Sequence, residues 1–293
     1  MTGIRIHRLA LPFLAAILSL AGAACGSSSE SSPSSSTTTG APLAIQGADF
    51  RFGAPSTVSA GLVNLTFSNH GQEEHEAQLL TIDPGHTADE LYSVASTPNS
   101  QPPTWAHGAG GAPAVEPGAS DTLTQVLTPG TYYILCLVSG SDNIPHVAKG
   151  MHSVLTVTGA ESKPSLPSSS GTVVAQEYSF KVPSLKAGRN TIEVRNDGPR
   201  QLHEWGLIKL APGFTVDKLK AALSSNGPPP PGPPPFTGVG GVAAYDPGGT
   251  ATFDADLQAG ANYAFICFAP DHAGEGPPGP HAARGMIAGF TPT

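Results

Sequence analysis

Apolar and polar residues alternate in two well-separated segments of the chain. In the first segment Val63, Leu65 and Phe67 are apolar and the residues between them are polar, and Ile192 and Val194 follow the same rule in the second. A period of two places the apolar side chains on one face of an extended chain. Both segments are therefore predicted to be β-strands with one buried face.

Four further segments extend this pattern. Residues 132–138 and 263–268 are more continuously apolar, as expected for strands in the interior of a sheet. Residues 153–158 and 286–290 follow them and are predicted to be the last strand of each half. The pattern thus predicts many short strands in each half of the chain.

Each half also carries one helical signal, beginning at Thr87 and at Thr215. Thr87-Ala-Asp-Glu90 fits a capping box, in which the first and last residues bond to each other's backbone N–H groups. The 35 Gly and 30 Pro among 293 residues are too many for a helical protein and suit strands joined by turns. A β-sandwich is predicted, with the proline-rich residues 227–235 as a stiff surface loop.

The chain contains an internal duplication with a unit of about 120 residues. The matching segments, in the same order in both halves, are 84–91 and 212–219, 108–111 and 238–241, 116–118 and 246–248, 132–136 and 263–267, and 146–151 and 281–286. A unit of this size is a domain rather than one turn of a solenoid. We predict domains at 43–159 and 171–293, joined by a polar Pro/Ser linker at 160–170.

Charged residues are scarce, and acidic residues outnumber basic ones. Lys and Arg number 14 and Asp and Glu 22, which gives a formal net charge of -8. The first 24 residues contain Arg5 and Arg8 and no acid, so their removal leaves 12 basic against 22 acidic residues, a net charge of -10. Such a charge argues against nucleic-acid binding, because phosphate backbones attract basic surfaces.

The N-terminal sequence is typical of an export signal. Arg5 and Arg8 precede the apolar run 9–20, which is too short to span a bilayer and gives way to small residues. Ala-Gly-Ala-Ala-Cys25 resembles a bacterial lipobox, whose cysteine is lipidated, although Gly22 stands where Leu is usual. Residues 25–42 are rich in Ser and Thr, as in a flexible tether.

We therefore predict a signal peptide at 1–24 and lipid attachment at Cys25, which anchors the protein to the outer face of the cell membrane. The alternative is ordinary cleavage after an Ala-x-Ala-like site, which gives an extracellular or periplasmic protein.

Each half places one His early and one Cys late, followed by a His and a Met. These residues are His75, Cys136, His146 and Met151 in the first half and His203, Cys267, His281 and Met286 in the second. Two imidazoles, a thiolate and a weak thioether are the ligand set of a type 1 (blue) copper site. The sequence predicts up to two such copper ions per chain.

In these residues the chain resembles the cupredoxin family, which includes plastocyanin. In that family the first His follows an Asn-containing turn, as His75 follows Asn69 and His203 follows Asn196 here, and His-x4-Met ends the ligand loop. The resemblance implies an all-β fold of two tandem cupredoxin-like Greek-key β-sandwiches, each with a short helix. It also implies that the eight residues named above are the copper ligands.

Two features depart from plastocyanin. Nine residues separate Cys136 from His146 and thirteen separate Cys267 from His281, a longer spacing than plastocyanin has. Glu76 and Glu204 follow the first His of each half, where plastocyanin has an Asn that helps to clamp the ligand loop.

The function expected from these residues is electron transfer or copper handling at the cell surface, with a redox protein or a copper donor or acceptor as partner. One alternative is a metal-free cupredoxin-like binding module, because fold does not determine function. Another is a two-domain copper oxidase or nitrite-reductase-like enzyme, which needs extra histidines beside the cysteine. Leu137 and Phe268 occupy that place, and the sequence contains no His-x-His, so no enzyme is predicted.

Two minor alternatives concern the same residue types. Cys136 and Cys267 could form an interdomain disulfide in an oxidising compartment. The histidines without a counterpart in the other half are predicted to be surface or loop residues, with the fourth and fifth as minor alternatives for a ligand: His70, His86, His107, His152 and His272.

Overall fold

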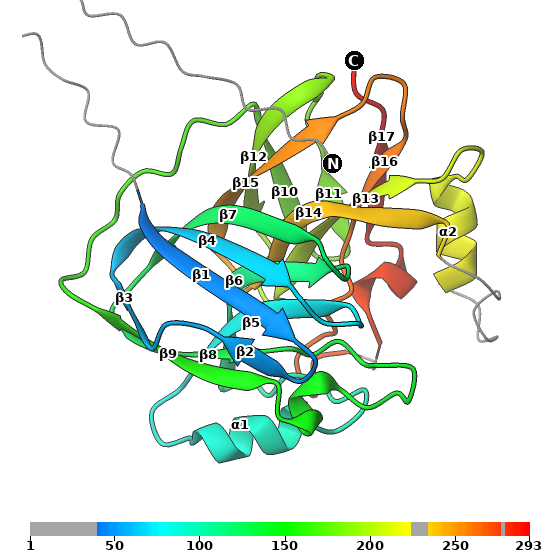
Figure 1. The fold of residues 1–293 in the computed structure, drawn as a ribbon. Helices are drawn as coiled ribbons and strands as arrows, with labels where there is room; N and C mark the ends of the chain where they lie inside the picture. Colours follow the sequence, from blue (N-terminus) through cyan, green and yellow to red (C-terminus); the bar gives the residue numbers. More distant parts are fainter. Residues whose placement is uncertain (1–39, 224–233, 277–278) are drawn as a thin grey trace, which may run out of the picture. The chain divides into compact units, whose positions relative to one another are not determined.

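Strands make up about half of residues 40–223, 234–276 and 279–293, the part of the chain that the computed structural model describes (Figure 1). The signal peptide, Cys25 and most of the tether lie outside the described residues, as does most of the predicted proline-rich loop. Residues 38–293 form one compact unit that contains both repeats. Within the described residues, no helix has the length and apolar character needed to cross a bilayer.

The two repeats contain corresponding elements in the same order, except that the described part of the second repeat has no counterpart of the third strand of the first. The elements of the first are β1 (Ala41–Ala48), β2 (Arg51–Gly53), β3 (Thr57–Ser59), β4 (Gly61–Asn69), β5 (His75–Ile82), α1 (Ala88–Ala95), β6 (Ala106–Val115), β7 (Ser120–Leu127), β8 (Gly130–Leu135), the 3-10 helix η1 (His146–Lys149) and β9 (His152–Thr158). Those of the second are β10 (Gly171–Gln176), β11 (Ser179–Lys181), β12 (Gly188–Asn196), β13 (His203–Leu210), α2 (Val216–Leu223), β14 (Phe236–Tyr245), β15 (Thr250–Leu257), β16 (Tyr263–Ile266), the 3-10 helix η2 (His281–Arg284) and β17 (Ile287–Phe290).

The alternating segments are strands with one buried face, as predicted. Val63, Leu65 and Phe67 of β4 and Ile192 and Val194 of β12 are all fully buried. The first strand, β1, begins at Ala41, so the last two residues of the segment predicted as tether belong to the sheet.

Each repeat has the short helix that the sequence predicts. In α1 the Thr87 hydroxyl accepts the Glu90 N–H (3.2 Å), and the Glu90 carboxylate accepts the Thr87 N–H (2.7 Å), which completes the capping box. In α2 the Lys218 N–H donates to the Thr215 hydroxyl at 3.3 Å. The two helices pack against η1 and η2 of their own repeats, next to the predicted ligands.

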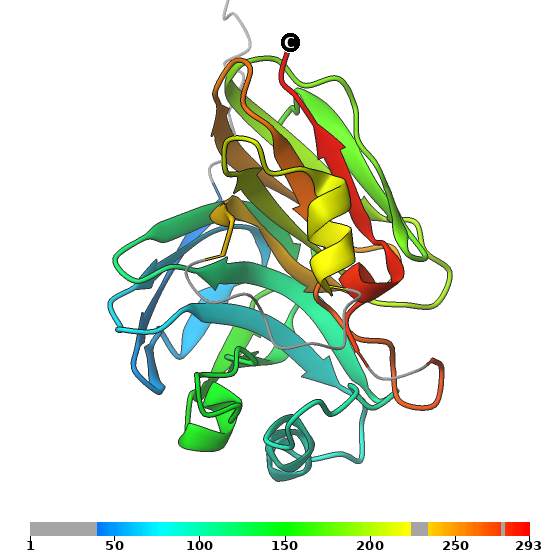
Figure 2. The same ribbon diagram turned by 90° about the vertical axis from the view of Figure 1, so that its right-hand side faces the viewer.

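The strands form two sheets, and both sheets run through both repeats. One has the order β11-β10-β12-β15-β7-β4-β1-β2, and the other has the order β17-β16-β13-β14-β6-β5-β8-β9-β3. The repeats therefore join edge to edge, where β7 pairs with β15 and β6 with β14 (Figures 1 and 2). A single buried apolar cluster, which includes Phe67 and Trp205, extends through the two repeats.

Gln78 of β5 ties the repeats together with its side-chain amide. Its Oε1 accepts the Ala244 N–H at 2.8 Å, and its Nε2 donates to the Ala244 carbonyl at 2.9 Å and to the Gly110 carbonyl at 3.0 Å. The Gln78 side chain thus makes the hydrogen bonds to the backbone that a neighbouring strand would otherwise make. Gln78 is buried, with 4% of its surface exposed.

We expect Gln78→Met to lower the free energy of unfolding by about 2–4 kcal/mol, because it leaves a buried donor and buried acceptors without partners. Urea denaturation of the purified protein measures this loss. Gln46→Met is the matched control, since Gln46 is exposed on β1, and a surface substitution changes stability by about 0.5 kcal/mol or less. Equal effects of the two substitutions would contradict the role given to the Gln78 amide.

A histidine bound by two carboxylates also crosses the junction. His107 Nδ1 lies 2.8 Å from Asp246 of the second repeat, and its Nε2 lies 3.0 Å from Asp83 of the first. A neutral imidazole can donate from only one nitrogen, so this arrangement favours the imidazolium. Burial lowers the pKa of His107, but the bonds to Asp246 and Asp83 outweigh burial and raise it above its ordinary value.

A raised pKa stabilises the fold below the ordinary histidine pKa, and the stabilisation is lost as the pH rises through the folded-state pKa. We therefore expect His107→Gln to destabilise the protein more at pH 5 than at pH 9. Unfolding curves of both proteins at the two pH values measure the difference. An effect that is the same at both pH values would show that His107 contributes no charge to the junction.

Candidate metal centres

Three predicted ligands of the first repeat converge on one point. His75 begins β5, Cys136 follows β8 and His146 begins η1, and all three are fully buried. The Nδ1 atoms of the two histidines lie 2.9 Å apart. Cys136 Sγ lies 3.8 Å from His75 Nδ1 and 3.5 Å from His146 Nδ1.

The second repeat brings its own three ligands together in the same way. His203 Nδ1 lies 3.1 Å from His281 Nδ1, and Cys267 Sγ lies 3.5 Å from the latter atom. His203, Cys267 and His281 are also fully buried. Among the described residues, these two triads are the sets of three or more His, Cys, Asp or Glu side chains placed to hold a metal ion.

The spacing of these atoms fits a small metal ion. A trigonal ion with bonds of about 2.0 Å to nitrogen and 2.3 Å to sulfur holds its ligand atoms roughly 3.5 Å apart. The distances between the ligand atoms, 2.9–3.8 Å in the first triad and 3.1–3.5 Å in the second, lie close to that value. Two histidines and one cysteine in this arrangement suit copper.

The methionines are held beside the triads by the backbone. Met151 and Met286 are fully buried. The Cys136 N–H donates to the Met151 carbonyl (3.2 Å), and the Cys267 N–H donates to the Met286 carbonyl (3.3 Å). Gly150 and Gly285, in the left-handed region at φ 98° and 93°, turn the chain from each 3-10 helix back toward the cysteine.

The long spacing between Cys and His does not displace the second histidine. The His146 N–H donates to the Val138 carbonyl and the His281 N–H to the Ala269 carbonyl, each at 2.9 Å. In each repeat an isolated β-bridge joins the two ends of the segment between the cysteine and the second histidine. The bridges pair Ser139 with Pro145 and Pro270 with Pro280. The backbone hydrogen bonds around the second histidine are therefore the same in both repeats, although the Cys–His spacing differs.

Carboxylates bind the outer nitrogens of three ligand histidines. Asp49 lies 3.1 Å from His75 Nε2, Glu73 lies 2.9 Å from His146 Nε2, and Asp271 lies 2.8 Å from His281 Nε2. A proton on Nε2 that is donated to a carboxylate leaves the lone pair of Nδ1 facing the cysteine, which orients the imidazole as a metal ligand. His203 Nε2 differs, since it is buried without a hydrogen-bond partner among the described residues.

Burial also sets the protonation of the ligands. It lowers the pKa of His146 and of His281, and together with His281 it lowers the pKa of His203 to about 3, so these imidazoles are neutral at pH 7. It raises the pKa of both Cys136 and Cys267. The thiols are therefore protonated without metal, and a metal ion must displace one proton from each when it binds.

Glu76 and Glu204 take the place of the plastocyanin Asn and make a clamp of their own. The Glu76 N–H donates to Cys136 Sγ (3.4 Å), and its carboxylate accepts the Leu137 N–H (2.8 Å). The Glu204 N–H donates to Cys267 Sγ at 3.4 Å. Burial raises the pKa of Glu204 to about 7, and burial and the charge of Glu204 raise the pKa of Glu76 to about 8.

An aromatic ring from the turn of a hairpin packs on the second histidine of each triad. Phe50, between β1 and β2, lies 5.1 Å from the His146 ring, and Tyr178, between β10 and β11, lies 5.2 Å from the His281 ring. Neither these two aromatic residues nor Asp49 is predicted from the sequence as part of the site. Their signal is a further match between the repeats, Asp49-Phe50 with Glu177-Tyr178.

Two minor alternatives from the sequence are wrong. Cys136 and Cys267 are free rather than disulfide-bonded. His272, predicted to be a surface or loop residue, lies in a loop but is only 5% exposed, because the Ala273 N–H donates to Pro102 of the first repeat and the His272 N–H donates to the Gln201 side chain. Neither His152 nor His272 joins a ligand triad.

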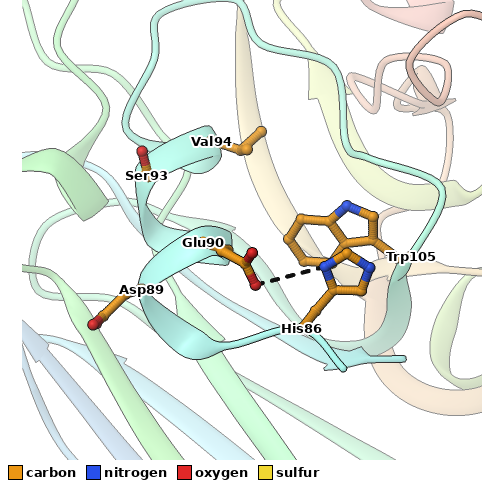
Figure 3. A pocket seen from close by; sticks show the side chains of 6 residues that line it. All are labelled: His86, Asp89, Glu90, Ser93, Val94 and Trp105. Carbon is orange, nitrogen blue, oxygen red and sulfur yellow. Dashed lines mark ion pairs between the residues drawn. The ribbon is translucent and has the colours of Figure 1, made fainter. Parts of the chain in front are cut away.

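A hollow of about 480 Å³ lies elsewhere, beside α1 (Figure 3). There the His86 ring stacks on Trp105 with centroids 4.1 Å apart, and its Nδ1 lies 3.6 Å from a Glu90 carboxylate oxygen. The side chains that line it are His86, Asp89, Glu90, Ser93, Val94 and Trp105, none of them a predicted ligand.

No family model and no curated protein matches this chain. Among solved structures it is similar to auracyanin from Roseiflexus castenholzii at 20% identity, over 40% of this chain and 97% of that one, with a TM-score of 0.29. It is also similar to copper nitrite reductase from Nitrosomonas europaea at 16% identity, over 86% of this chain and 93% of that one, with a TM-score of 0.25. Such values transfer no function.

The assignment therefore rests on the chain's own topology and side chains. Each repeat contributes strands to two sheets, and each brings its predicted His, Cys and His residues into one buried triad, with the predicted Met bonded to the cysteine through the backbone. The chain is an all-β protein with a candidate type 1 copper site in each of its two repeats, the arrangement that its resemblance to cupredoxins implies.

Proposed function

We propose that the protein is an exported blue copper protein that transfers electrons or holds copper at the cell surface. The observation that carries this proposal is the pair of buried triads, in which two Nδ1 atoms and one Sγ atom face each other at metal-ligand spacing. The buried position and the fixed imidazoles keep the ligands in one geometry, which lowers the rearrangement that accompanies electron transfer.

Electron transfer or copper handling is favoured over catalysis by the residues that flank the cysteines. Leu137 and Phe268 follow Cys136 and Cys267 directly and are 40% and 41% exposed. A copper oxidase or nitrite-reductase-like enzyme needs a histidine there to connect the type 1 copper to a second copper. The partner that we propose is a redox protein or a copper donor or acceptor.

Titration of the metal-free protein with Cu(II), followed by visible absorption, tests the proposal. We expect an intense band from thiolate-to-copper charge transfer, which saturates at two copper ions per chain. Protein that takes up copper and stays colourless would contradict type 1 sites. Protein that takes up none would favour a metal-free binding module.

We further propose that a lipid on Cys25 anchors the protein to the membrane. Its support is the lipobox-like Ala-Gly-Ala-Ala-Cys25 and the Ser/Thr-rich segment that follows it, which lie outside the described residues. Stable anchoring requires more than one acyl chain, as in a bacterial lipoprotein.

Replacement Cys25→Ala should therefore move the protein from the membrane fraction to the soluble fraction of the exporting cell. Ser27→Ala is the matched control, because it changes a neighbouring small residue and leaves the lipidation site in place. Immunoblots of fractionated cells measure the distribution. Equal membrane association of both variants would show that Cys25 is not the anchor.

A further inference from the structure

The surroundings of the two triads differ on the side of the second histidine. In the first repeat a hollow of about 300 Å³ reaches His146, and its lining includes Glu73, Glu74, Ser139 and Ser141. The Glu73 side chain is 38% exposed and bonds to His146 Nε2. Carboxylate and hydroxyl side chains therefore line a hollow that ends at Glu73 and the fully buried His146, a candidate copper ligand.

The equivalent residues of the second repeat are buried. Gln201 and Leu202 correspond to Glu73 and Glu74 by their spacing from the first histidine, and they are 0% and 5% exposed. Asp271 and His272 correspond to Gly140 and Ser141 by their spacing from the cysteine, and they are 0% and 5% exposed.

Residues of the first repeat help to cover the second triad. Gln101 Nε2 donates to the carbonyls of Asp271 (3.3 Å) and Gly276 (3.1 Å), and the Ala273 N–H donates to the Pro102 carbonyl (2.9 Å). These bonds hold residues 271–276, which follow Cys267, against the first repeat.

Charged and polar groups also hold Asp271, which belongs to this segment, against His281. Asp271 accepts from His281 Nε2 and from the Tyr178 hydroxyl (3.1 Å) and pairs with Arg284 (2.5 Å). The Arg284 guanidinium lies 4.6 Å from the centre of the Tyr178 ring. An ion can reach the second triad from this side only after several of these contacts have opened.

We propose that copper ions enter and leave the first site through the hollow beside His146. The second site retains its ion, because the contacts of Asp271 with His281, Tyr178 and Arg284 close the corresponding side. This inference rests on the proposed function, because it assigns different exchange behaviour to the two copper sites. Glu74 and the two serines supply oxygen ligands for an incoming divalent cation, and the soft thiolate of Cys136 then retains it. The first site is the one that exchanges copper with the surroundings, and the second is a retained centre.

The test follows the visible band of the copper-loaded full chain after addition of EDTA. We expect two phases, with the second site slower by about tenfold or more, since each 1.4 kcal/mol required for local opening slows exchange tenfold. Cys267→Ser should retain only the fast phase, and Cys136→Ser only the slow one. A single phase, or the reverse assignment of the phases, would overturn the inference.

Variants outside the ligand sets test the route without touching the metal centres. Glu74→Gln should slow Cu(II) uptake by the first site severalfold, and Glu161→Gln, which removes the same charge from an exposed linker residue, should not. Gln101→Ala should accelerate the slow EDTA phase alone. Equal effects of Glu74→Gln and Glu161→Gln, or an unchanged slow phase in Gln101→Ala, would overturn the inference while leaving copper binding intact. A chain that develops no band at all would refute the proposed function itself.

Discussion

Replacing Cys136 and Cys267 together by serine is expected to abolish the intense visible absorption of the copper-loaded protein. The absorption requires charge transfer from a thiolate to Cu(II), and a serine hydroxyl supplies neither the soft donor nor the transition. Serine is close to cysteine in size, so the closely packed surroundings of both fully buried positions can be kept. Absorption spectra at equal protein and copper concentrations measure the loss.

The single variants serve as controls for the double one. Cys136→Ser and Cys267→Ser should each keep one copper ion per chain and about half of the absorption, because each triad lies within its own repeat. Circular dichroism in the far ultraviolet should show the same strand content in all variants. A full-strength band in the double variant would exclude both cysteines as ligands.

The fold could be predicted because its strongest signals are local or repeated. The alternation at Val63, Leu65 and Phe67 requires only the period of an extended chain, and the Thr87 capping box requires only residues three positions apart. The junction could not be predicted in this way, because Gln78 and Ala244 are 166 positions apart and their pairing depends on which sheet edges meet.

The candidate ligands were found because a His, Cys, His and Met set recurs in the same order in both halves. Their supporting groups were missed for a physical reason. Asp49 reaches His75 only because the turn between β1 and β2 places it there, and its counterpart Glu177 accepts backbone N–H groups of Arg200 and Gln201 instead. The burial of His272 depends on Gln101 and Pro102, which belong to the other repeat. Such contacts leave no periodic trace in a single sequence.

The largest difference between the two sites concerns charge, and it leads to an expected difference in reduction potential. In the first site, carboxylates bind the outer nitrogens of both histidines, Asp49 on His75 and Glu73 on His146. In the second site Asp271 binds His281, its charge is paired with Arg284, and His203 Nε2 has no hydrogen-bond partner among the described residues. Uncompensated negative charge stabilises the more positive Cu(II) and lowers the potential.

The expected size of this difference follows from Coulomb's law. One net charge roughly 7 Å from the metal, at an effective dielectric constant of about 20, changes the energy of a one-electron step by about 2 kcal/mol. Solvent reaches Asp49, which is 36% exposed, and Glu73, which is 38% exposed, and screens them. We therefore expect the first site to have the lower potential by roughly 50 mV, given 59 mV for each tenfold change in a one-electron equilibrium.

Redox titrations of full-length Cys267→Ser and Cys136→Ser report the first and the second site separately. Asp49→Asn in the Cys267→Ser protein should raise the first site's potential toward that of the second, because it removes one of the two carboxylate charges and keeps the shape of the side chain. Asp254→Asn is the matched control, since Asp254 is an exposed residue of β15 that binds Arg189 and Thr191. Equal potentials in the two single-site proteins, or a higher potential in the first, would refute the carboxylate argument and leave the copper assignment to stand on its own test.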